Sequence, residues 1–393
     1  MLNTQVSAEI ELKRRAAELV PVLRSHAKWA DENRRLHGES IEALADAGVF
    51  RMRVPVRYGG YESDASTLFE VLSAVGAGDG SASWNAAVWS TCAWLACLFP
   101  DHVQDEVFAD ADARVCGVLS PTAEAVPANG GLAVNGQWHF ISGALHSRWQ
   151  VIMAMAPTPD GAQQWPVMAV VPMSDLAIVD DWHTTGLRGT GSVTTVAKGV
   201  FVPQDRVLPV PAILQGQYAS KLNADSPVYR APLIATGCTC FTGTAVGLAK
   251  AAAEVFMSRL DRKMTYTDYT AQREASVTHL QVAEAMLKIE EAESHAARLA
   301  VMADSKSSPD DEWTPEERIR SRAYLGRVFY LAKGAVDVLK EASGASSIYT
   351  TTPIQRIAQD IDALSMHALM HPTTNFELFG RVLCGLEPNT MYI

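Results

Sequence analysis

The sequence predicts an α+β fold built from three consecutive parts, the first helical, the second β and the third helical again. Apolar residues recur at helical spacing in the first third of the chain. Short segments rich in Val, Thr and aromatic residues follow, separated by Gly, Pro and Asn turns, and long helical patterns return near Pro227. We therefore predict an N-terminal α-helical domain at 1–113, a middle β-domain at 114–226 and a C-terminal helical bundle at 227–393.

The N-terminal helices are indicated by apolar spacing and by the residues that end them. ESIEALADAGVF carries Leu44 and Val49 on one helical face, and Gly48 marks the expected end of that helix. Further on, GDGSASWNAAVWSTCAWLACLF is apolar on every face, which is typical of a buried helix. This helix carries three tryptophans, Trp84, Trp89 and Trp94.

The middle part contains several short strand patterns at close spacing, which favour a small barrel or sandwich. Asn-Gly is the strongest two-residue hairpin signal, so Asn135–Gly136 predicts a turn between two strands.

One strand pattern, GQWHFISGALHSRW, is unusually rich in aromatic, histidine and serine residues. Strand alternation predicts that Trp138, Phe140 and Ser142 share one face, with His139 on the other. Two rings and a hydroxyl on one face suit a flat heteroaromatic ligand that accepts or donates one directed hydrogen bond. The alternative is a core strand in which Ser142 only caps the turn at Gly143.

The C-terminal part begins a long helix with clear signals. Thr314 and Glu317 predict a capping box, and Pro315 occupies the first helical position. The apolar stripe that follows consists of Leu325, Val328, Phe329, Ala332, Val336 and Leu339.

Composition excludes several classes of partner. The formal net charge is -11 and no block of basic residues is present, which argues against nucleic acid and anionic membranes. The start of the chain shows no apolar signal-peptide core, and no apolar run is long enough to span a bilayer. The six cysteines form no CxxC pair, so we expect reduced thiols in a cytoplasmic protein.

Three further stretches carry residues capable of chemistry. CGVLSPT offers Ser120 and Thr122 at the end of a strand, although a Ser-Pro turn explains the same letters. TTGLRGTGS is rich in glycine but matches no phosphate-binding loop. His367 and His371 are expected to share a helical face, where one functional histidine is favoured over a metal pair and a buried structural histidine is the alternative.

Taken in order, these stretches resemble the acyl-CoA dehydrogenase fold along nearly the whole chain. Five stretches are similar to segments of that family and occur in the same order along the chain: AGVFRMRVPVRYGGYESD, VLSPT, NGQWHFISG, GLRGTGSVTTVAKGVFVP and ASGASSIYTTTPIQRIAQD. The resemblance implies an N-terminal helical domain, a middle β-barrel or sandwich and a C-terminal four-helix bundle.

Two departures from the dehydrogenase pattern change the expected reaction. Ala368 occupies the position at which many of these enzymes carry the catalytic Glu, so removal of a proton next to a thioester has no base. The flavin-phosphate segment is also degraded, to RKMTYTDYTAQ. The chain more closely resembles the two-component flavin-dependent monooxygenases that share this fold.

This second resemblance implies specific residues. Ser142 is expected to contact flavin N5, and His367 to orient the substrate or take its proton. Some relatives carry a histidine on the first-domain helix, where tryptophans stand here. The implied cofactor-binding residues are Ser120, Thr122, Trp138, Phe140, Ser142, Trp182 and Arg262. The implied substrate pocket contains Trp84, Trp89, His146 and His371, and no metal is expected.

The implied activity is hydroxylation of an aromatic or indole-like small molecule by reduced FAD or FMN and O2, through a C4a-hydroperoxyflavin. Two alternatives remain open: an N-oxygenase acting on an amino sugar, and an acyl-CoA dehydrogenase or oxidase with an unusual base. The expected partners are a separate NAD(P)H-dependent flavin reductase and further copies of the chain in a homotetramer.

Overall fold

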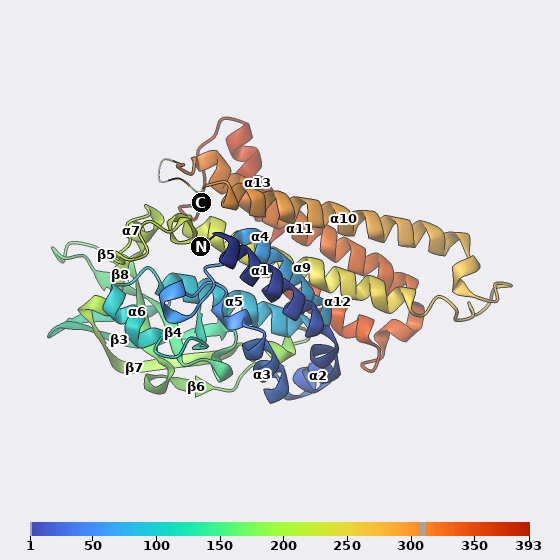
Figure 1. The fold of residues 1–393 in the computed structure, drawn as a ribbon, viewed down its shortest axis with the longest axis horizontal. Helices are drawn as coiled ribbons and strands as arrows, with labels where there is room; N and C mark the ends of the chain where they lie inside the picture. The colour runs from blue at the N-terminus through green and yellow to red at the C-terminus, as the bar shows by residue number, and fades with distance from the viewer. Residues whose placement is uncertain (1, 307, 309–310) are drawn as a thin grey trace.

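The computed structural model describes residues 2–306, 308 and 311–393, and its elements follow the predicted order of helical, β and helical parts (Figure 1). The first part consists of α1 (Leu2–Glu18), α2 (Val20–Asn33), α3 (Gly38–Asp46), α4 (Ala65–Gly78), α5 (Gly80–Ala96) and α6 (Asp101–Val107). As predicted, Gly48 follows α3 in the left-handed conformation, with φ of 83°.

The β part forms one eight-stranded sheet where the sequence predicts a barrel or sandwich. Its strands are β1 (Val115–Gly117), β2 (Ala123–Ala128), β3 (Gly131–Ile141), β4 (Trp149–Pro157), β5 (Gln164–Pro172), β6 (Ala177–Val179), β7 (Val193–Pro203) and β8 (Val207–Pro209). The order across the sheet is β6-β7-β3-β2-β4-β5-β8, with β1 paired to β4. β1 and β2 run parallel to β4, and the other pairs are antiparallel.

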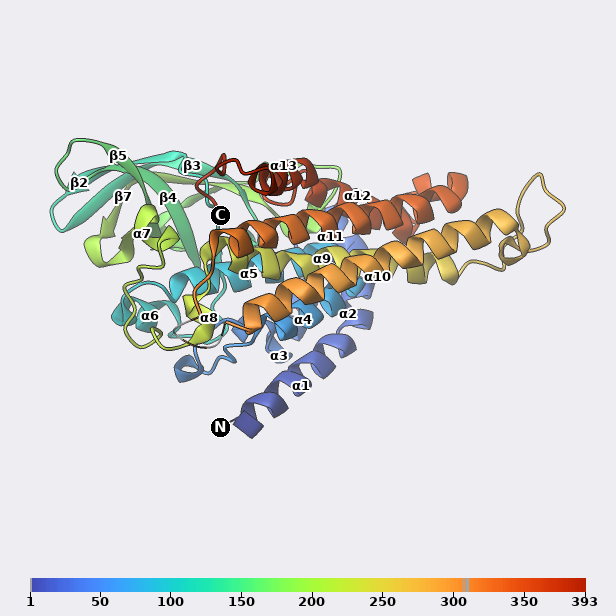
Figure 2. The same cartoon turned by 90° about the horizontal axis from the view of Figure 1, so that it is seen from above.

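The third part is dominated by three long helices, α9 (Leu233–Met257), α10 (Ser276–Asp304) and α11 (Pro315–Ala342), which run side by side away from the sheet (Figure 2). The shorter helices of this part are α8 (Pro227–Arg230), α12 (Pro353–Ser365) and α13 (Pro372–Leu383), and the short helix α7 (Val210–Leu214) packs on β5 and β8 of the middle part. The predicted capping box is confirmed, because the Thr314 hydroxyl accepts from the Glu317 N–H at 3.2 Å and the Glu317 carboxylate accepts from the Thr314 N–H at 2.8 Å.

The predicted hairpin turn at Asn135–Gly136 is wrong. These two residues lie within the continuous strand β3, and the turn between β2 and β3 is formed instead by Asn129 and Gly130. Gly136 has a φ of 152° and sits at a shift of register between β3 and β7. The second Asn-Gly pair therefore supplies a bulge within a strand rather than a turn.

Helix α5 lies at the centre of the molecule and is buried along its whole length, as its all-apolar pattern predicts. It contacts β1 and β4 of the sheet as well as α4, α9 and α12. Residues on α5 therefore face both the sheet and the helical part.

Helix α9 packs unusually close to α4 because both helices carry glycine at the contact. A Cβ on Gly243 would lie 2.7 Å from the Phe69 carbonyl oxygen, and one on Gly247 would lie 2.3 Å from the Ser73 carbonyl oxygen. By length and composition α9 is apolar enough to cross a membrane, but 94% of its most apolar window is buried within the protein. Burial on this scale is typical of a core helix.

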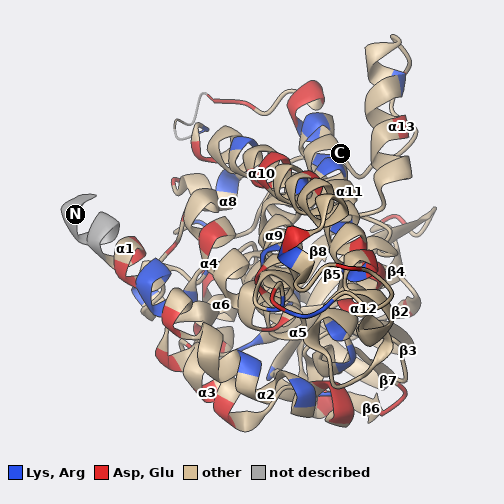
Figure 3. Ribbon diagram, turned by 90° about the vertical axis from the view of Figure 1, so that its right-hand side faces the viewer, with Lys and Arg blue, Asp and Glu red and all other residues tan. Residues whose placement is uncertain are grey.

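Charged residues of both signs intermingle on the outer helices (Figure 3), but two carboxylates are buried together at the start of α5. Asp79 caps α5 by accepting from the Ala82 N–H at 2.8 Å, and the Asp360 carboxylate accepts from the Leu187 N–H at 2.6 Å. Burial first, and then the charge of Asp79, raise the pKa of Asp360 to about 7. The Arg356 cation opposes this shift, and Asp31 adds to it.

We predict that Asp360→Asn flattens the dependence of stability on pH, since asparagine keeps an acceptor for the Leu187 N–H and does not titrate. A carboxyl whose pKa is raised by folding stabilises the protein at low pH, and this contribution is lost as the pH rises through about 7. The free energy of unfolding of the wild type should fall by a few kcal/mol from about pH 5 to about pH 8, and its melting temperature should fall with it. The melting temperature of the variant should fall less over the same range.

Circular dichroism at several pH values measures this difference. Asp362→Asn is the matched control, because Asp362 lies on the same helix and is partly exposed in an ion pair with Lys333. It should follow the wild-type profile. An Asp360→Asn profile as steep as that of the wild type would contradict the role of this carboxyl.

Candidate functional site

Three aromatic side chains from three separate elements meet beside the end of β3. Trp84 of α5 lies 4.9 Å from the Phe241 ring of α9, measured between centroids, and 5.5 Å from the His367 ring. Phe241 and His367 are 6.4 Å apart. We call these three residues the aromatic cluster. Trp84 and Phe241 are buried, whereas His367 is reached by solvent.

His367 is accessible to water and yet crowded by protein, since its ring packs against those of Trp84 and Phe241. This crowding lowers the pKa of His367 to about 4, so its imidazole is neutral at pH 7. Its Nδ1 accepts from the Leu369 N–H at 3.2 Å, which leaves the ring proton on Nε2. His367 therefore presents an N–H donor to its surroundings.

The prediction that His367 and His371 share a helical face is wrong, because α12 ends at Ser365 and α13 begins at Pro372. His367 lies in the intervening turn, where its carbonyl accepts from the N–H groups of Met370 and His371. His371 is exposed just before α13 and is not part of the aromatic cluster. The orientation of the His367 ring is therefore set by this turn and not by a helix.

Ser142 adds a hydroxyl to this region from the end of β3. Its Oγ accepts from the Trp84 Nε1–H at 2.9 Å and lies 2.7 Å from the Ser192 Oγ. Ser192 lies 2.7 Å from the Thr190 Oγ1, which donates to the Leu187 carbonyl at 2.7 Å. The hydroxyls of Ser142, Ser192 and Thr190 form a chain that we call the hydroxyl relay. Ser142 is only 5% exposed, so whether its hydroxyl donates or accepts strongly affects the binding of any group that reaches it.

The glycines of TTGLRGTGS hold the relay by allowing close packing rather than by binding phosphate. A Cβ on Gly186 would lie 2.0 Å from the Gln359 carbonyl oxygen of α12, and one on Gly189 would lie 3.0 Å from the Cβ atoms of Ala30 and Ser81. Between these contacts Leu187 adopts a φ of 52°, which is costly for a residue with a branched side chain. The loop is therefore fixed by the helices on either side.

Phe140 and Trp138 do not share a face, contrary to the alternation predicted for β3. A register shift lies between Trp138 and Ile141, where Phe140 adopts a φ of 63°. This bulge leaves Phe140 66% exposed and Trp138 fully buried, with its indole N–H donating to the Met153 carbonyl at 2.8 Å. Trp138 is thus a core residue, and its predicted contact with a cofactor is wrong because no surface of the ring is available.

The exposed Phe140 ring meets Trp182 edge to face at 5.9 Å between centroids. The Trp182 indole N–H donates to the Leu187 carbonyl at 3.0 Å, which ties this ring to the same loop as the hydroxyl relay. Nearby on the sheet, Ser120 and Thr122 are exposed, and the Thr122 hydroxyl donates to the Gln137 carbonyl at 2.6 Å. Phe140 thus offers exposed apolar surface two residues before Ser142, and Ser120 and Thr122 are exposed polar groups just before β2.

Trp89 and His146 lie away from the aromatic cluster. Trp89 is buried, meets Phe50 edge to face at 5.2 Å, and donates to the Ser147 hydroxyl at 3.0 Å, so it is a core residue rather than a pocket wall. His146 is half-buried, and burial followed by the neighbouring Arg114 and Arg35 cations lowers its pKa to about 4.

Arg262 is committed to contacts within the protein. Its guanidinium donates to the Gln272 side chain at 2.7 Å, to the Ser346 hydroxyl at 2.9 Å, and to the carbonyls of Ala342 and Ser343 at 3.1 and 2.7 Å. These contacts join the end of α9 to the end of α11. Arg262 in this conformation leaves no donor directed at a phosphate, so its predicted role in binding the cofactor has no support from the geometry of one chain.

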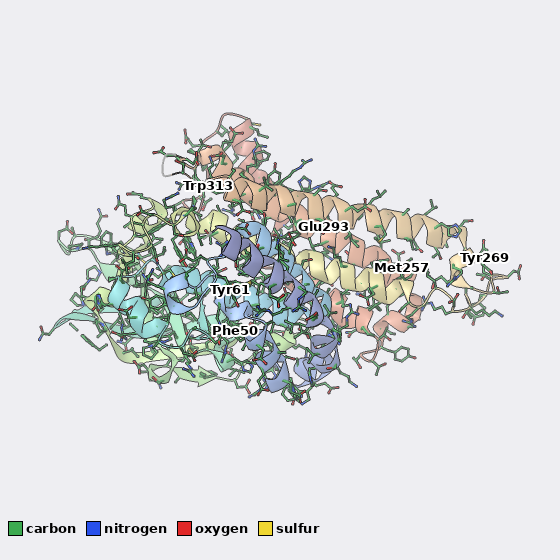
Figure 4. All side chains as sticks on the ribbon, in the orientation of Figure 1. Phe50, Tyr61, Met257, Tyr269, Glu293 and Trp313 are labelled. Atoms are coloured by element: carbon green, nitrogen blue, oxygen red, sulfur yellow. The ribbon has the colours of Figure 1, made fainter. Side chains whose placement is uncertain are left out.

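A cavity of about 490 Å³ lies elsewhere, between the 215–232 segment and the start of α11. Its lining includes Cys97, at the opposite end of α5 from Trp84, roughly 20 Å away along the helix. It also includes Trp313, which Figure 4 places at one end of the α10–α11 pair, with Tyr269 at the far tip. Neither the aromatic cluster nor Ser142 lines this cavity.

Sequence reasoning singled out Ser142, Trp84 and His367, which the structure brings together, but it missed the residues that join them. Phe241 belongs to a helix that is apolar on every side, so no periodicity distinguishes it. Ser192 and Thr190 lie in the glycine-rich stretch that matched no known loop, and only the structure shows that their hydroxyls connect to Ser142.

The family models of acyl-CoA dehydrogenases match both helical parts of the chain. The model of the N-terminal domain matches residues 11–106, and that of the C-terminal domain matches residues 239–372.

Individual relatives match almost the entire chain. The oxygenase component of FADH2-dependent resorcinol hydroxylase from Rhizobium sp. (strain MTP-10005) is 29% identical over 99% of this chain and 97% of its own length. The crystal structure of 3-HSA hydroxylase from Rhodococcus sp. RHA1 aligns with a TM-score of 0.91 and 28% identity, covering 98% of this chain and 99% of its own. XiaF from Streptomyces sp., in complex with FADH2 and glycerol, aligns with a TM-score of 0.90 and 28% identity, covering 99% and 98%.

The different positions of Trp138 and Phe140 predict unequal effects of their substitution on the free energy of unfolding. Trp138→Ala should lower the free energy of unfolding by about 3–5 kcal/mol, because it removes a fully buried ring and leaves the Met153 carbonyl without its donor. Phe140→Ala should change it by about 0.5 kcal/mol or less, because the ring is mostly exposed. Urea denaturation measures both values, and equal losses in the two variants would contradict the bulge at Phe140.

Proposed function

The chain belongs to the acyl-CoA dehydrogenase family, and we propose that it is the oxygenase component of a two-component flavin-dependent monooxygenase. We further propose that it hydroxylates an aromatic or indole-like small molecule with reduced FAD or FMN and O2. Relatives along the whole chain support this proposal, including an indole-3-acetate monooxygenase from Pseudomonas putida that is 26% identical over 92% of this chain and 91% of its own length.

The observation that carries the proposal is the pairing of a buried hydroxyl with a neutral imidazole across an aromatic cluster. Ser142 and His367 are both linked to Trp84, the first by a hydrogen bond of 2.9 Å and the second by a ring contact at 5.5 Å. Of the described residues, those that form this group are Ser142, Trp84, Phe241 and His367, and none of them carries a carboxylate. A dehydrogenase of this fold requires such a base, whereas oxygen transfer to an activated ring does not.

The residues beside Ser142 suit the ring end of a flavin. Phe140 offers an exposed aromatic face, Trp182 packs against its edge, and the Ser142 hydroxyl is available to one ring atom. A reduced flavin held by these residues would supply the electrons that activate O2 for the reaction. Trp84 and Phe241 keep the adjoining surface apolar, which limits the access of water.

His367 is proposed to orient the substrate through its Nε2–H. Because Nδ1 accepts from the Leu369 N–H, the neutral ring is a donor at Nε2 and not a base there. A donor at this position stabilises negative charge on a phenol oxygen, which makes the ring carbons more nucleophilic. This refines the sequence-based expectation, which left open whether His367 orients the substrate or takes its proton.

The remaining parts of the proposal concern partners. Two relatives are named as oxygenase components, a term used for systems in which a separate reductase supplies the reduced flavin. We therefore propose that reduced flavin arrives from an NAD(P)H-dependent partner in the cytoplasm. We also propose a homotetramer assembled through the helical part. Leu280, Leu287 and Val301 are exposed along α10 at intervals of seven residues or a multiple of seven, which supports a buried helix face in an assembly.

Product analysis with a generic flavin reductase, NADH, and FMN or FAD tests the proposal directly. We expect hydroxylated products from a panel of phenols and indoles, and none from amino sugars. Ser142→Ala should raise the share of NADH that ends as hydrogen peroxide, because the hydroxyl beside the flavin is lost. Ser147→Ala, which removes a comparable hydroxyl held by Trp89, is the control and should keep the wild-type coupling. No oxygen consumption with any substrate would refute the proposed function.

His367→Gln should lower kcat/KM for hydroxylation by roughly 10²-fold, because a preorganised donor to the substrate oxygen is displaced. In the wild type the imidazole charges only near pH 4, so no acid limb at about pH 6.5 should arise from this residue. His371→Gln is the matched control, since His371 is exposed and lies outside the cluster. Rate profiles from about pH 5 to about pH 8 measure both effects, and full turnover by His367→Gln would contradict the assignment.

A further inference from the structure

The direction of every hydrogen bond in the hydroxyl relay follows from its last acceptor. The Leu187 carbonyl cannot donate, so the Thr190 proton points to it across 2.7 Å. Thr190 then has only lone pairs to offer to Ser192, so the Ser192 proton points to Thr190. By the same reasoning the Ser142 proton points to Ser192. The relay runs in one direction from Ser142 to Leu187.

This direction decides what Ser142 can offer to a ligand. A hydroxyl has one proton and two lone pairs. The Ser142 proton is given to Ser192, and one lone pair accepts from the Trp84 Nε1–H. One lone pair remains, so Ser142 is an acceptor toward any group that approaches it.

We propose that Thr190 and Ser192 are positioning residues that hold Ser142 as an acceptor, so that the site binds flavin with a protonated N5 and disfavours oxidised flavin. The inference rests on the proposed function. Reduced flavin carries a hydrogen on N5, whereas N5 of oxidised flavin has only a lone pair. In a buried site, two facing acceptors lose a hydrogen bond and repel each other, which costs roughly tenfold to a hundredfold in affinity.

The relay can impose this preference because its end point cannot turn. The Leu187 N–H is held by the buried Asp360 carboxylate at 2.6 Å, and its carbonyl also accepts from the Trp182 indole at 3.0 Å. Gly186 leaves no room for movement toward α12, since a Cβ there would meet the Gln359 carbonyl at 2.0 Å. Rotation of the Leu187 peptide would break these contacts together.

The chain also contains a matched pair that lacks the relay. Trp89 follows Trp84 by five residues and donates to Ser147, which follows Ser142 by five residues, at 3.0 Å. The Ser147 hydroxyl donates directly to the Gly143 carbonyl at 2.9 Å. This second Trp–Ser pair has a similar donor–acceptor distance, but its serine hydroxyl donates to a backbone carbonyl and not to the hydroxyl of Thr190 or Ser192.

The experiment measures dissociation constants of FMN and FAD, each in the oxidised form and in the anaerobically reduced form, by fluorescence and absorbance titration of the full chain. Thr190→Val removes the last hydroxyl, so the Ser192 proton turns to Ser142 and the Ser142 proton turns to the ligand. We expect the ratio of oxidised to reduced dissociation constants to fall by roughly tenfold, chiefly through tighter binding of the oxidised form. Ser192→Ala should change the ratio in the same direction.

Two controls separate relay polarity from general damage to the fold. Thr190→Ser restores a hydroxyl and should restore the wild-type ratio, and Ser147→Ala should leave that ratio unchanged. Circular dichroism establishes that each variant is folded, and Ser192→Ala decides the matter if Thr190→Val is not folded.

The possible outcomes distinguish this inference from the proposed function. Wild-type protein that binds both redox forms equally, or folded relay variants whose ratio stays within about twofold of the wild type, would overturn the relay while leaving hydroxylation with reduced flavin intact. Wild-type protein that binds neither form would overturn the proposed function itself. A reduced ratio in Thr190→Val that Thr190→Ser restores would support the relay.

Discussion

The candidate site depends on one strained peptide, that of Leu187. Its N–H is bound by a buried carboxylate from α12, and its carbonyl accepts from an indole and from the end of the hydroxyl relay. The left-handed conformation of a non-glycine residue costs on the order of 1–3 kcal/mol, and it persists here because several contacts fix it at once. A strained loop that joins the sheet to the helical part gives Ser142 a defined polarity and Trp182 a defined position.

Helix α5 explains why residues far apart in the sequence act together. It is buried on all sides and reaches both the sheet and the helical part, so a single residue such as Trp84 can donate to Ser142 while its ring contacts Phe241 and His367. The four residues of this group come from all three parts of the chain, and no single part contains them all. The three-part architecture therefore creates the site at the place where the parts meet.

The sequence predicts the order of elements well because periodicity and caps are local signals. Gly48 and the Thr314–Glu317 box lie where the chain itself determines the structure. The faces of β3 were predicted less well, because one bulged residue at Phe140 reverses the side on which each later residue lies.

The site could be predicted only in part for a similar reason. His367 was singled out as a candidate, but α12 ends two residues before it, so helical spacing misplaced its relation to His371. Phe241, Thr190 and Ser192 gain their roles from contacts across the fold that no local pattern records. Arg262 looked like a phosphate ligand because it is a cation near a degraded motif, whereas its donors serve the ends of α9 and α11.

The placement of charge within the core separates this site from that of a dehydrogenase on the same fold. The buried carboxylates Asp79 and Asp360 lie at the start of α5, where backbone N–H groups stabilise them and where they fix the loop. The aromatic cluster instead contains an imidazole that stays neutral at pH 7, and Ser142 beside it accepts a hydrogen bond from Trp84. Neutral polar groups attract less water than a carboxylate does, so this arrangement keeps the site apolar while still directing two hydrogen bonds. An oxygen-transferring site needs both properties, because water that enters diverts the oxidant to peroxide.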